Sequence, residues 1–227
     1  MILVTAATAP VGRSIVEQLL EAGREVRALT RDPGEAGLPE RAEVVAGDLS
    51  DPESLRAAME GVSAVFLLAV VPGFAPAFLE AAREAGVRRI VFQSSGAILD
   101  GAEDQPNEIA AFHREIEREI EESGLEWTFL RLEVASADAL QWAFDVPGQL
   151  SRGDVVRGPY ADAAGSPIHR ADFPAVAVAA LTDDRHAGKT YLLTGPRSLT
   201  NAEQIELIGR ALDPDASLRG TDPRGGA

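Results

Sequence analysis

The sequence predicts an α/β protein with a doubly wound parallel sheet. Short apolar runs alternate with amphipathic helical patterns along most of the 227 residues, which is typical of strand–helix–strand units. The run at residues 63–71 is apolar almost throughout, as expected for a central strand buried on both faces. The first sixteen residues form one such unit, with a strand, a loop of small residues and a helix. A chain of this length can bury one full core and carry a small appended lobe.

Each element is predicted from its periodicity and from the residues at its ends. Strands are expected at residues 1–4, 25–30, 43–46, 63–71, 88–93, 126–132 and 190–194, with a short one at 154–157. Helices are expected at residues 11–21, 72–86, 108–123, 171–181 and 201–212. A further helix is expected to start at about residue 52. Glycines predict the C-terminal ends of three helices, at Gly23, Gly86 and Gly124. N-cap residues predict the starts of two others, at Ser50 or Asp51 and at Thr200 or Asn201. In the helix at 108–123, the stripe expected to face the core is Ile109, Phe112, Ile116 and Ile120.

The loop after the first strand departs from the glycine pattern of dinucleotide-binding folds. In such folds the cofactor pyrophosphate lies against the helix N-terminus, and glycines are expected here at positions 6, 9 and 12. The chain has Ala6, Ala9 and Gly12, so only the glycine for close helix–strand packing remains. The two alanines add methyl groups where the backbone needs positive φ or a close approach to phosphate, and Pro10 lacks an N–H. The loop predicts either weakened dinucleotide binding or a fold of this class that has lost its cofactor.

The end of the second strand bears on the choice of nucleotide. An acidic residue there binds the ribose hydroxyls of NAD, whereas a nearby arginine accommodates the 2′-phosphate of NADP. The strand ends at Thr30 and is followed by Arg31. Asp32 lies one residue beyond the position at which an acidic residue would bind the ribose of NAD. The pattern therefore favours NADP(H), the alternative being a solvated arginine in a turn.

Composition narrows the class of partner. The formal net charge of −15 argues against nucleic acid and anionic membranes, which both need a basic surface. The absence of cysteine excludes disulfides and thiolate sites, and three scattered histidines predict no metal site. No apolar run is long enough to span a bilayer, and the N-terminus lacks a basic signal-peptide region. We expect a cytoplasmic protein with a small-molecule substrate; its oligomeric state is not predicted.

Several motifs occur in an ordered series along the chain. They are Ile2-Leu-Val-Thr-x-Ala-Thr-x-x-Val-Gly, Val26-Arg-Ala-Leu-Thr-Arg-Asp-Pro33, Gly47-Asp-Leu49, Ser94-Ser95-Gly96 and Gly124-Leu-Glu-Trp-Thr-Phe-Leu-Arg131. In this order and spacing they resemble the atypical short-chain dehydrogenase/reductases of the NmrA-like type, which are NAD(P)H-binding proteins of bacterial cytoplasm. The resemblance covers residues 1–212 and implies a Rossmann-like fold. Because relatives usually continue beyond the last helix, part of the substrate-side lobe is expected to be missing.

The resemblance also implies a set of cofactor-binding residues. Asp48 and Leu49 flank the adenine in this arrangement, although Asp48 also suits a turn. The full set is Thr5, Ala6, Thr8, Ala9, Pro10, Val11, Arg31, Asp48, Leu49 and Ser94.

The proton-donor pair of the short-chain enzymes is replaced in this chain. Those enzymes use a tyrosine as proton donor, with a lysine four residues later that lowers its pKa. Counting back from Arg131 places Ile109 at the tyrosine position and His113 at the lysine position. Neither Tyr160 nor Tyr191, the only tyrosines, lies on this helix. Proton transfer by the usual residue is therefore not available.

Two other residues are candidates for catalysis. His113 lies four residues before Glu117 on one helical face, so the carboxylate can orient and charge the imidazole; the alternative is a surface pair or a packed histidine. Ser95 aligns with the family's catalytic serine, and Ser94 lies beside it at the carboxyl end of a parallel strand, where ligands bind in open sheets. The alternative for either serine is strand-end capping.

Three functions follow from these patterns. The first is an NADPH-dependent reductase of a small carbonyl or quinone, with Ser95 polarising the oxygen and His113 or water supplying the proton. The others are a non-catalytic NADP(H) sensor and a non-redox enzyme, such as an isomerase, dehydratase or cyclase. We expect a dinucleotide-binding domain at residues 1–150, substrate-side elements at 151–212 and a disordered tail at 213–227. Trp142 and Phe144 are expected to form an apolar wall of the substrate pocket.

Overall fold

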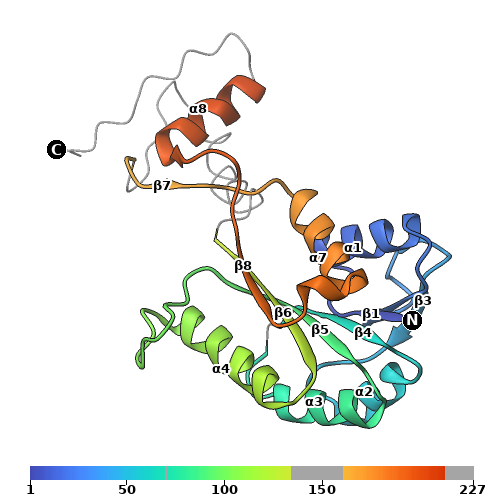
Figure 1. The fold of residues 1–227 in the computed structure, drawn as a ribbon. Helices are drawn as coiled ribbons and strands as arrows, with labels where there is room; N and C mark the ends of the chain where they lie inside the picture. The colour runs from blue at the N-terminus through green and yellow to red at the C-terminus, as the bar shows by residue number, and fades with distance from the viewer. Residues whose placement is uncertain (70, 134–160, 213–227) are drawn as a thin grey trace. The chain divides into compact units, whose positions relative to one another are not determined.

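The predicted parallel sheet is present, with seven strands. A computed structural model describes residues 1–69, 71–133 and 161–212 (Figure 1). All neighbouring strands of the sheet are parallel, and their order is β3-β2-β1-β4-β5-β6-β8. The strands are β1 (Ile2–Val4), β2 (Val26–Thr30), β3 (Glu43–Ala46), β4 (Ala64–Leu67), β5 (Arg89–Ser95), β6 (Glu126–Leu132) and β8 (Lys189–Leu193). The order reverses between β1 and β4, as in a doubly wound Rossmann-like fold.

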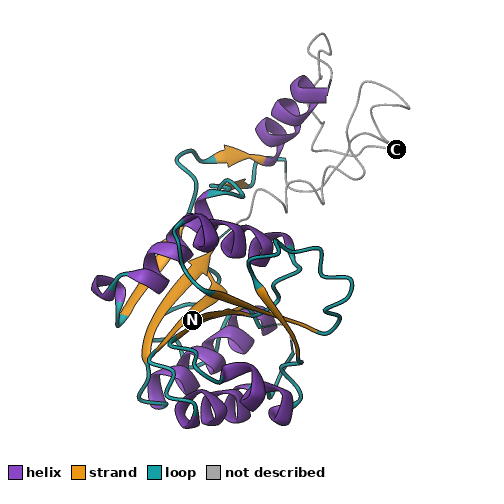
Figure 2. Ribbon diagram, turned by 90° about the vertical axis from the view of Figure 1, so that its right-hand side faces the viewer, coloured by secondary structure: helices purple, strands orange, loops and turns teal. Residues whose placement is uncertain are grey.

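Helices cover both faces of this sheet. One face carries α1 and α7, which contact each other, and the other carries α2, α3 and α4 (Figures 1 and 2). Their bounds are α1 (Pro10–Glu21), α2 (Pro52–Met59), α3 (Ala75–Glu84), α4 (Glu108–Glu122) and α7 (Asp172–Thr182). Side-chain caps start two of them, because Asp51 accepts from the Glu53 N–H at 3.1 Å and Asn107 from the Ala110 N–H at 2.9 Å. None of the helices in the described ranges is long and apolar enough to cross a membrane.

The chain divides into two compact units. Unit 1 comprises residues 1–132 and 171–193 and contains the seven-stranded sheet; unit 2 comprises residues 133–170 and 194–227. The described part of unit 2 contains a two-stranded antiparallel sheet, β7 (Ala164–Gly165) with β9 (Leu199–Thr200), and helix α8 (Asn201–Leu212). The predicted cap of α8 is confirmed: Thr200 Oγ1 accepts from the Glu203 N–H, and the Glu203 carboxylate accepts from the Thr200 N–H. The expected boundary at residue 150, the tail at 213–227, the strand at 154–157, Trp142 and Phe144 lie outside the described residues.

Two strands end two or more residues away from their predicted ends, for local reasons. The strand expected at 63–71 ends at Leu67, because the next N–H, of Leu68, is bound by the Thr5 hydroxyl at 2.9 Å instead of a sheet carbonyl. The strand expected to end at residue 93 continues to Ser95, because β6 runs alongside it as far as Leu132. Ser94 and Ser95 are therefore strand residues rather than loop residues.

The predicted core stripe of α4 is wrong at one position. Ile116 and Ile120 are buried and Phe112 packs against the core, but the Ile109 residue is 63% exposed. Ala110, the next residue in the same first turn of α4, is fully buried, so the buried face contains Ala110 instead of Ile109 at this end of the helix. Apolar periodicity placed the stripe one residue away from the face that is buried there.

A buried arginine joins β5 to the C-terminal end of α7. Arg89 is fully buried, and its Nη1 donates to the backbone carbonyls of Ala180 at 3.2 Å and Asp183 at 3.0 Å. Its Nη2 is 2.8 Å from a Glu126 carboxylate oxygen and 2.7 Å from an Asp184 carboxylate oxygen. The guanidinium thus satisfies carbonyls at the end of α7 that have no partner within the helix.

Candidate functional site

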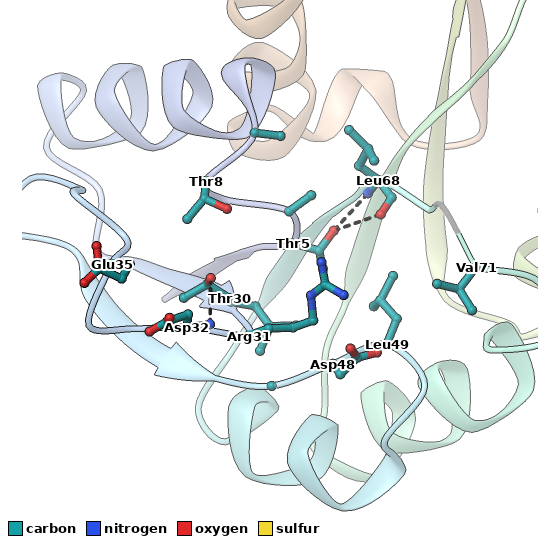
Figure 3. Close-up of a pocket in the computed structure, with 14 residues that line it drawn as sticks. Thr5, Thr8, Thr30, Arg31, Asp32, Glu35, Asp48, Leu49, Leu68 and Val71 are labelled. Carbon is teal, nitrogen blue, oxygen red and sulfur yellow. Dashed lines mark hydrogen bonds between the residues drawn. The ribbon is translucent and has the colours of Figure 1, made fainter.

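A pocket of about 580 Å³ lies at the carboxyl ends of the first four strands of unit 1. This is the crevice beside the point where the strand order reverses, the position at which open α/β sheets bind their ligands. Its lining residues are Thr5, Ala6, Thr8, Ala9, Leu29, Thr30, Arg31, Asp32, Glu35, Gly47, Asp48, Leu49, Leu68 and Val71 (Figure 3). The set includes seven of the ten predicted cofactor-binding residues; Pro10 and Val11, in the first turn of α1, and Ser94 are not among them.

The loop from β1 to α1 has the backbone of a glycine-type loop with alanine in it. Ala6 has φ of +47°, the left-handed conformation that glycine adopts without strain, and its carbonyl accepts from the Ala9 N–H at 3.0 Å. A Cβ atom on Gly12 would overlap the Ala6 carbonyl, so Gly12 does permit close packing of α1, but against the loop after β1 rather than against the strand itself. Ala9 itself has φ of −67°, so its methyl group needs no left-handed backbone.

We expect Ala6→Gly to stabilise the protein. Glycine relieves the strain of the left-handed conformation, and an alanine there costs on the order of 1 kcal/mol. Thermal or denaturant unfolding measures the gain, and Ala6→Ser is the matched control because serine keeps a Cβ atom and hence the strain. A lower melting temperature for Ala6→Gly than for the wild type would contradict the conclusion that the left-handed backbone at Ala6 is strained.

The N-terminus of α1 is open to an anionic ligand. Its N-cap is Ala9, which makes no side-chain capping bond, and no acidic residue occupies the first turn. Pro10 has no N–H, but the N–H groups of Val11 and Gly12 remain without partners within the helix. Together with the positive end of the helix dipole, they suit a pyrophosphate group. Thr5 serves the framework instead, because its buried hydroxyl bridges β1 to Leu68 after β4 (Figure 3).

The opposite side of the pocket carries one cation among several carboxylates. The Arg31 side chain extends from the end of β2 across the pocket, with Asp32 and Glu35 on one side and Asp48 on the other (Figure 3). Asp48 accepts from the Ser50 hydroxyl at 2.6 Å and from the Ser50 N–H at 2.8 Å. These bonds, with the Arg31 charge, lower the pKa of Asp48 below its ordinary value. Asp48 is thus both a turn residue and a residue of the pocket wall.

Arg13 is a residue of this region that the sequence did not indicate. It lies in the first turns of α1 and donates to the backbone carbonyls of Ala36, at 2.9 Å, and Gly37. It thereby ties α1 to the segment after Arg31 and Glu35. Because its partners are backbone carbonyls 23 and 24 residues away, no spacing of residue types could have revealed it.

The two predicted serines have different surroundings. Ser94 is buried, and its hydroxyl donates to Glu117 at 2.7 Å. Ser95 is half-buried, and its oxygen accepts from the Ala97 N–H at 3.2 Å in a turn at the end of β5. Since side chains alternate along a strand, Ser94 faces α4 and Ser95 the opposite face of the sheet. Ser94 is therefore already bonded within the protein, whereas the Ser95 hydroxyl proton has no acceptor within this turn.

His113 is held on α4 without the help of Glu117. Its Nδ1 is 2.8 Å from the Ile109 carbonyl oxygen, and its ring stacks on Phe92 with centroids 5.9 Å apart. A carbonyl can only accept, so Nδ1 carries the proton and Nε2 is the free nitrogen. The expected His113–Glu117 pair is wrong, because Glu117 is engaged with Ser94 and Arg131.

The structure thus gathers the cofactor candidates but not the catalytic ones. Ser95 and His113 do not line the 580 Å³ pocket. They lie on opposite sides of the sheet, because His113 of α4 stacks on Phe92, whereas Ser95 points to the other face of β5. Across residues 1–69, 71–133 and 161–212, no three carboxylate or imidazole side chains form a group that could hold a metal ion.

Comparison with known proteins assigns the chain to a family. A family model described as NAD(P)H-binding matches residues 6–184. The chain is 39% identical over 215 residues to the (4-alkanoyl-5-oxo-2,5-dihydrofuran-3-yl)methyl phosphate reductase of Streptomyces griseus, with 93% of this chain and 74% of that protein covered. It is 34% identical over 217 residues to the NAD(P)H azoreductase of Xenophilus azovorans, covering 93% of this chain and 73% of that protein.

A solved structure agrees with this assignment. The NADPH-dependent quinone oxidoreductase of Escherichia coli, in complex with NADPH, aligns with a TM-score of 0.81 and 27% identity, covering 99% of this chain and 78% of that one. The fold, the pocket at the switch point and the matched family model agree with the resemblance found in the sequence. The chain belongs to the NAD(P)H-binding family.

Proposed function

We propose that the protein is an NADPH-dependent reductase of small carbonyl or quinone compounds. The observation that carries the proposal is the pocket, in which an uncapped helix N-terminus faces one side and Arg31 the other. The prediction of an NADP(H)-binding reductase is confirmed by the family and by relatives named as reductases of small substrates.

Each part of the chain has a distinct task in this proposal. The first turn of α1 binds the pyrophosphate, Arg31 binds the 2′-phosphate, and Asp48 and Leu49 flank the adenine. When bound, the nicotinamide supplies the hydride. Ser95 donates a hydrogen bond to the substrate oxygen. Because His113 lies on the other face of the sheet at β5, the proton that this oxygen takes up comes from water or from His113 through a water molecule.

A titration of the pure protein with NADPH and NADH tests the proposal. We expect saturable binding of NADPH with a Kd well below about 1 mM, because enzymes typically bind their substrates with constants of about 1 μM to 1 mM. We also expect oxidation of NADPH with at least one member of a panel of quinones and carbonyl compounds. The absence of binding would refute cofactor use, while binding without oxidation by any acceptor would indicate a sensor instead.

We expect Arg31→Ala to weaken NADPH binding by about tenfold or more, because a hydrogen bond to a charged group contributes about 1.5–3 kcal/mol. NADH lacks the 2′-phosphate, so its affinity should not fall. Calorimetry on both cofactors measures the ratio. Arg185→Ala is the matched control, since it removes the same charge from an exposed arginine that pairs with Asp183. An unchanged NADPH preference in Arg31→Ala would place the 2′-phosphate elsewhere.

A further inference from the structure

Glu117 has no part in the steps above, yet it is the centre of a buried polar network. Its carboxylate is fully buried and accepts hydrogen bonds from side chains on three elements. The donors are the Ser94 hydroxyl on β5 at 2.7 Å, the Arg131 guanidinium on β6 at 3.0 and 2.8 Å, and Arg114 on α4 itself at 3.3 Å. The bidentate bond to Glu117 raises the pKa of Arg131 above its ordinary value.

A second branch of the network reaches the loop between β5 and α4. Arg131 Nη1 is 2.9 Å from an Asp100 carboxylate oxygen, and Asp100 is 80% exposed at the surface of that loop. The loop is also closed on itself, because the Gln105 amide group bonds the N–H and the carbonyl of Leu99, both at 3.0 Å. Arg131 thus joins a fully buried carboxylate to an exposed one.

Residues of this network lie next to both catalytic candidates, Ser95 and His113. Ser94 immediately precedes Ser95, and Glu117 lies one helical turn after His113 on α4. Asp100 anchors the connection between these two positions. Glu117 binds Ser94 and Arg131, and Arg131 in turn binds Asp100, so these bonds fix the segment that carries Ser95 and His113.

Stability alone does not account for a buried ion pair of this kind. Desolvating a carboxylate and a guanidinium costs about as much as their attraction returns, and well-packed apolar residues are often equally stable or more so. What the pair adds is a single geometry, since a bidentate arginine–carboxylate bond fixes both the distance and the plane of its partners.

We propose that Glu117 is a positioning residue of the reductase site, holding the end of β5, the end of β6 and the middle of α4 so that Ser95 and His113 keep their places. The inference rests on the proposed function for its catalytic consequence, but its structural part can be tested separately.

The variant Glu117→Gln tests the catalytic consequence. Glutamine keeps the length of the side chain and an acceptor for Ser94, but it removes the charge that binds Arg131. We expect kcat to fall by about tenfold or more, because small displacements of reacting groups lower rates steeply. The Kd for NADPH should stay within about twofold, since the pocket residues are not touched. Glu121→Gln is the control, because Glu121 bonds the same Arg114 but neither Ser94 nor Arg131.

A readout that does not depend on turnover tests the positioning itself. We expect Glu117→Gln to speed amide hydrogen exchange at residues 94–107 and to shift the imidazole resonances of His113, with β1 and β4 unchanged. Asp100→Asn removes only the exposed end of the network, so it keeps the test available if Glu117→Gln does not fold. We expect faster exchange in this variant too, confined to the loop after β5.

The outcomes separate the two proposals. Unchanged exchange and unchanged His113 resonances in folded Glu117→Gln would overturn the positioning role. So would a wild-type kcat, or a loss of activity no greater than the loss of folded protein. If the wild-type protein reduces none of the acceptors, the reductase proposal has failed, and the exchange and resonance data still decide the role of Glu117.

Discussion

Arg89→Ala is expected to lower the free energy of unfolding by at least about 3 kcal/mol, because a long buried side chain is replaced by a cavity and buried acceptors lose their donor. The carbonyls of Ala180 and Asp183 at the end of α7 lose their partner, and the carboxylates of Glu126 and Asp184 each lose one of the two arginines that they contact. Helix α7 covers one face of the sheet at β4 and β5. Denaturant unfolding followed by circular dichroism measures the loss.

The neighbouring arginine provides the matched control. Arg88 bonds the same two carboxylates, Glu126 at 3.6 Å and Asp184 at 2.9 Å, but its side chain is 53% exposed. Exposed ion pairs contribute about 0–1 kcal/mol, so Arg88→Ala should have a small effect. Similar losses in the two variants would mean that the shared carboxylates, rather than the burial of Arg89, determine the contribution.

The sequence predicted the architecture because its signals are local. Apolar runs, glycines at helix ends and capping residues each specify a short segment, and the right order of segments defines a doubly wound sheet. Gly12 and Ala6 illustrate how far such local signals reach. The glycine pattern identified the position at which the backbone needs positive φ, and the structure places Ala6 there with φ of +47°.

The surroundings of the site residues could not be predicted in the same way. Glu117 and His113 have the spacing of a helical pair, yet Glu117 bonds Ser94 and Arg131, which come from two different strands. A pattern within one helix gives no information on donors that the sheet brings to it. The Arg13 contacts to backbone carbonyls are hidden for the same reason, since every residue type offers a carbonyl.

Replacing His113 with glutamine is expected to lower kcat for carbonyl reduction by about a hundredfold or more, the usual contribution of a positioned acid. The glutamine amide can still donate a hydrogen bond to the Ile109 carbonyl and so keep the local structure. It is too weak an acid to transfer a proton to the substrate. The affinity for NADPH should not change, because His113 does not line the pocket. Stopped-flow measurement of NADPH oxidation under single-turnover conditions separates the chemical step from product release.

A second histidine provides the control for this assignment. The Ile109 carbonyl accepts from Nδ1 of His113, so a proton that the ring gives to the substrate must leave from Nε2. His186→Gln should keep the wild-type kcat, because His186 bonds the Tyr191 hydroxyl at 2.9 Å and has no part in the proposed chemistry. If His113→Gln also kept the wild-type kcat, water rather than His113 would be the proton donor, and no residue of α4 would take over the role of the replaced tyrosine and lysine.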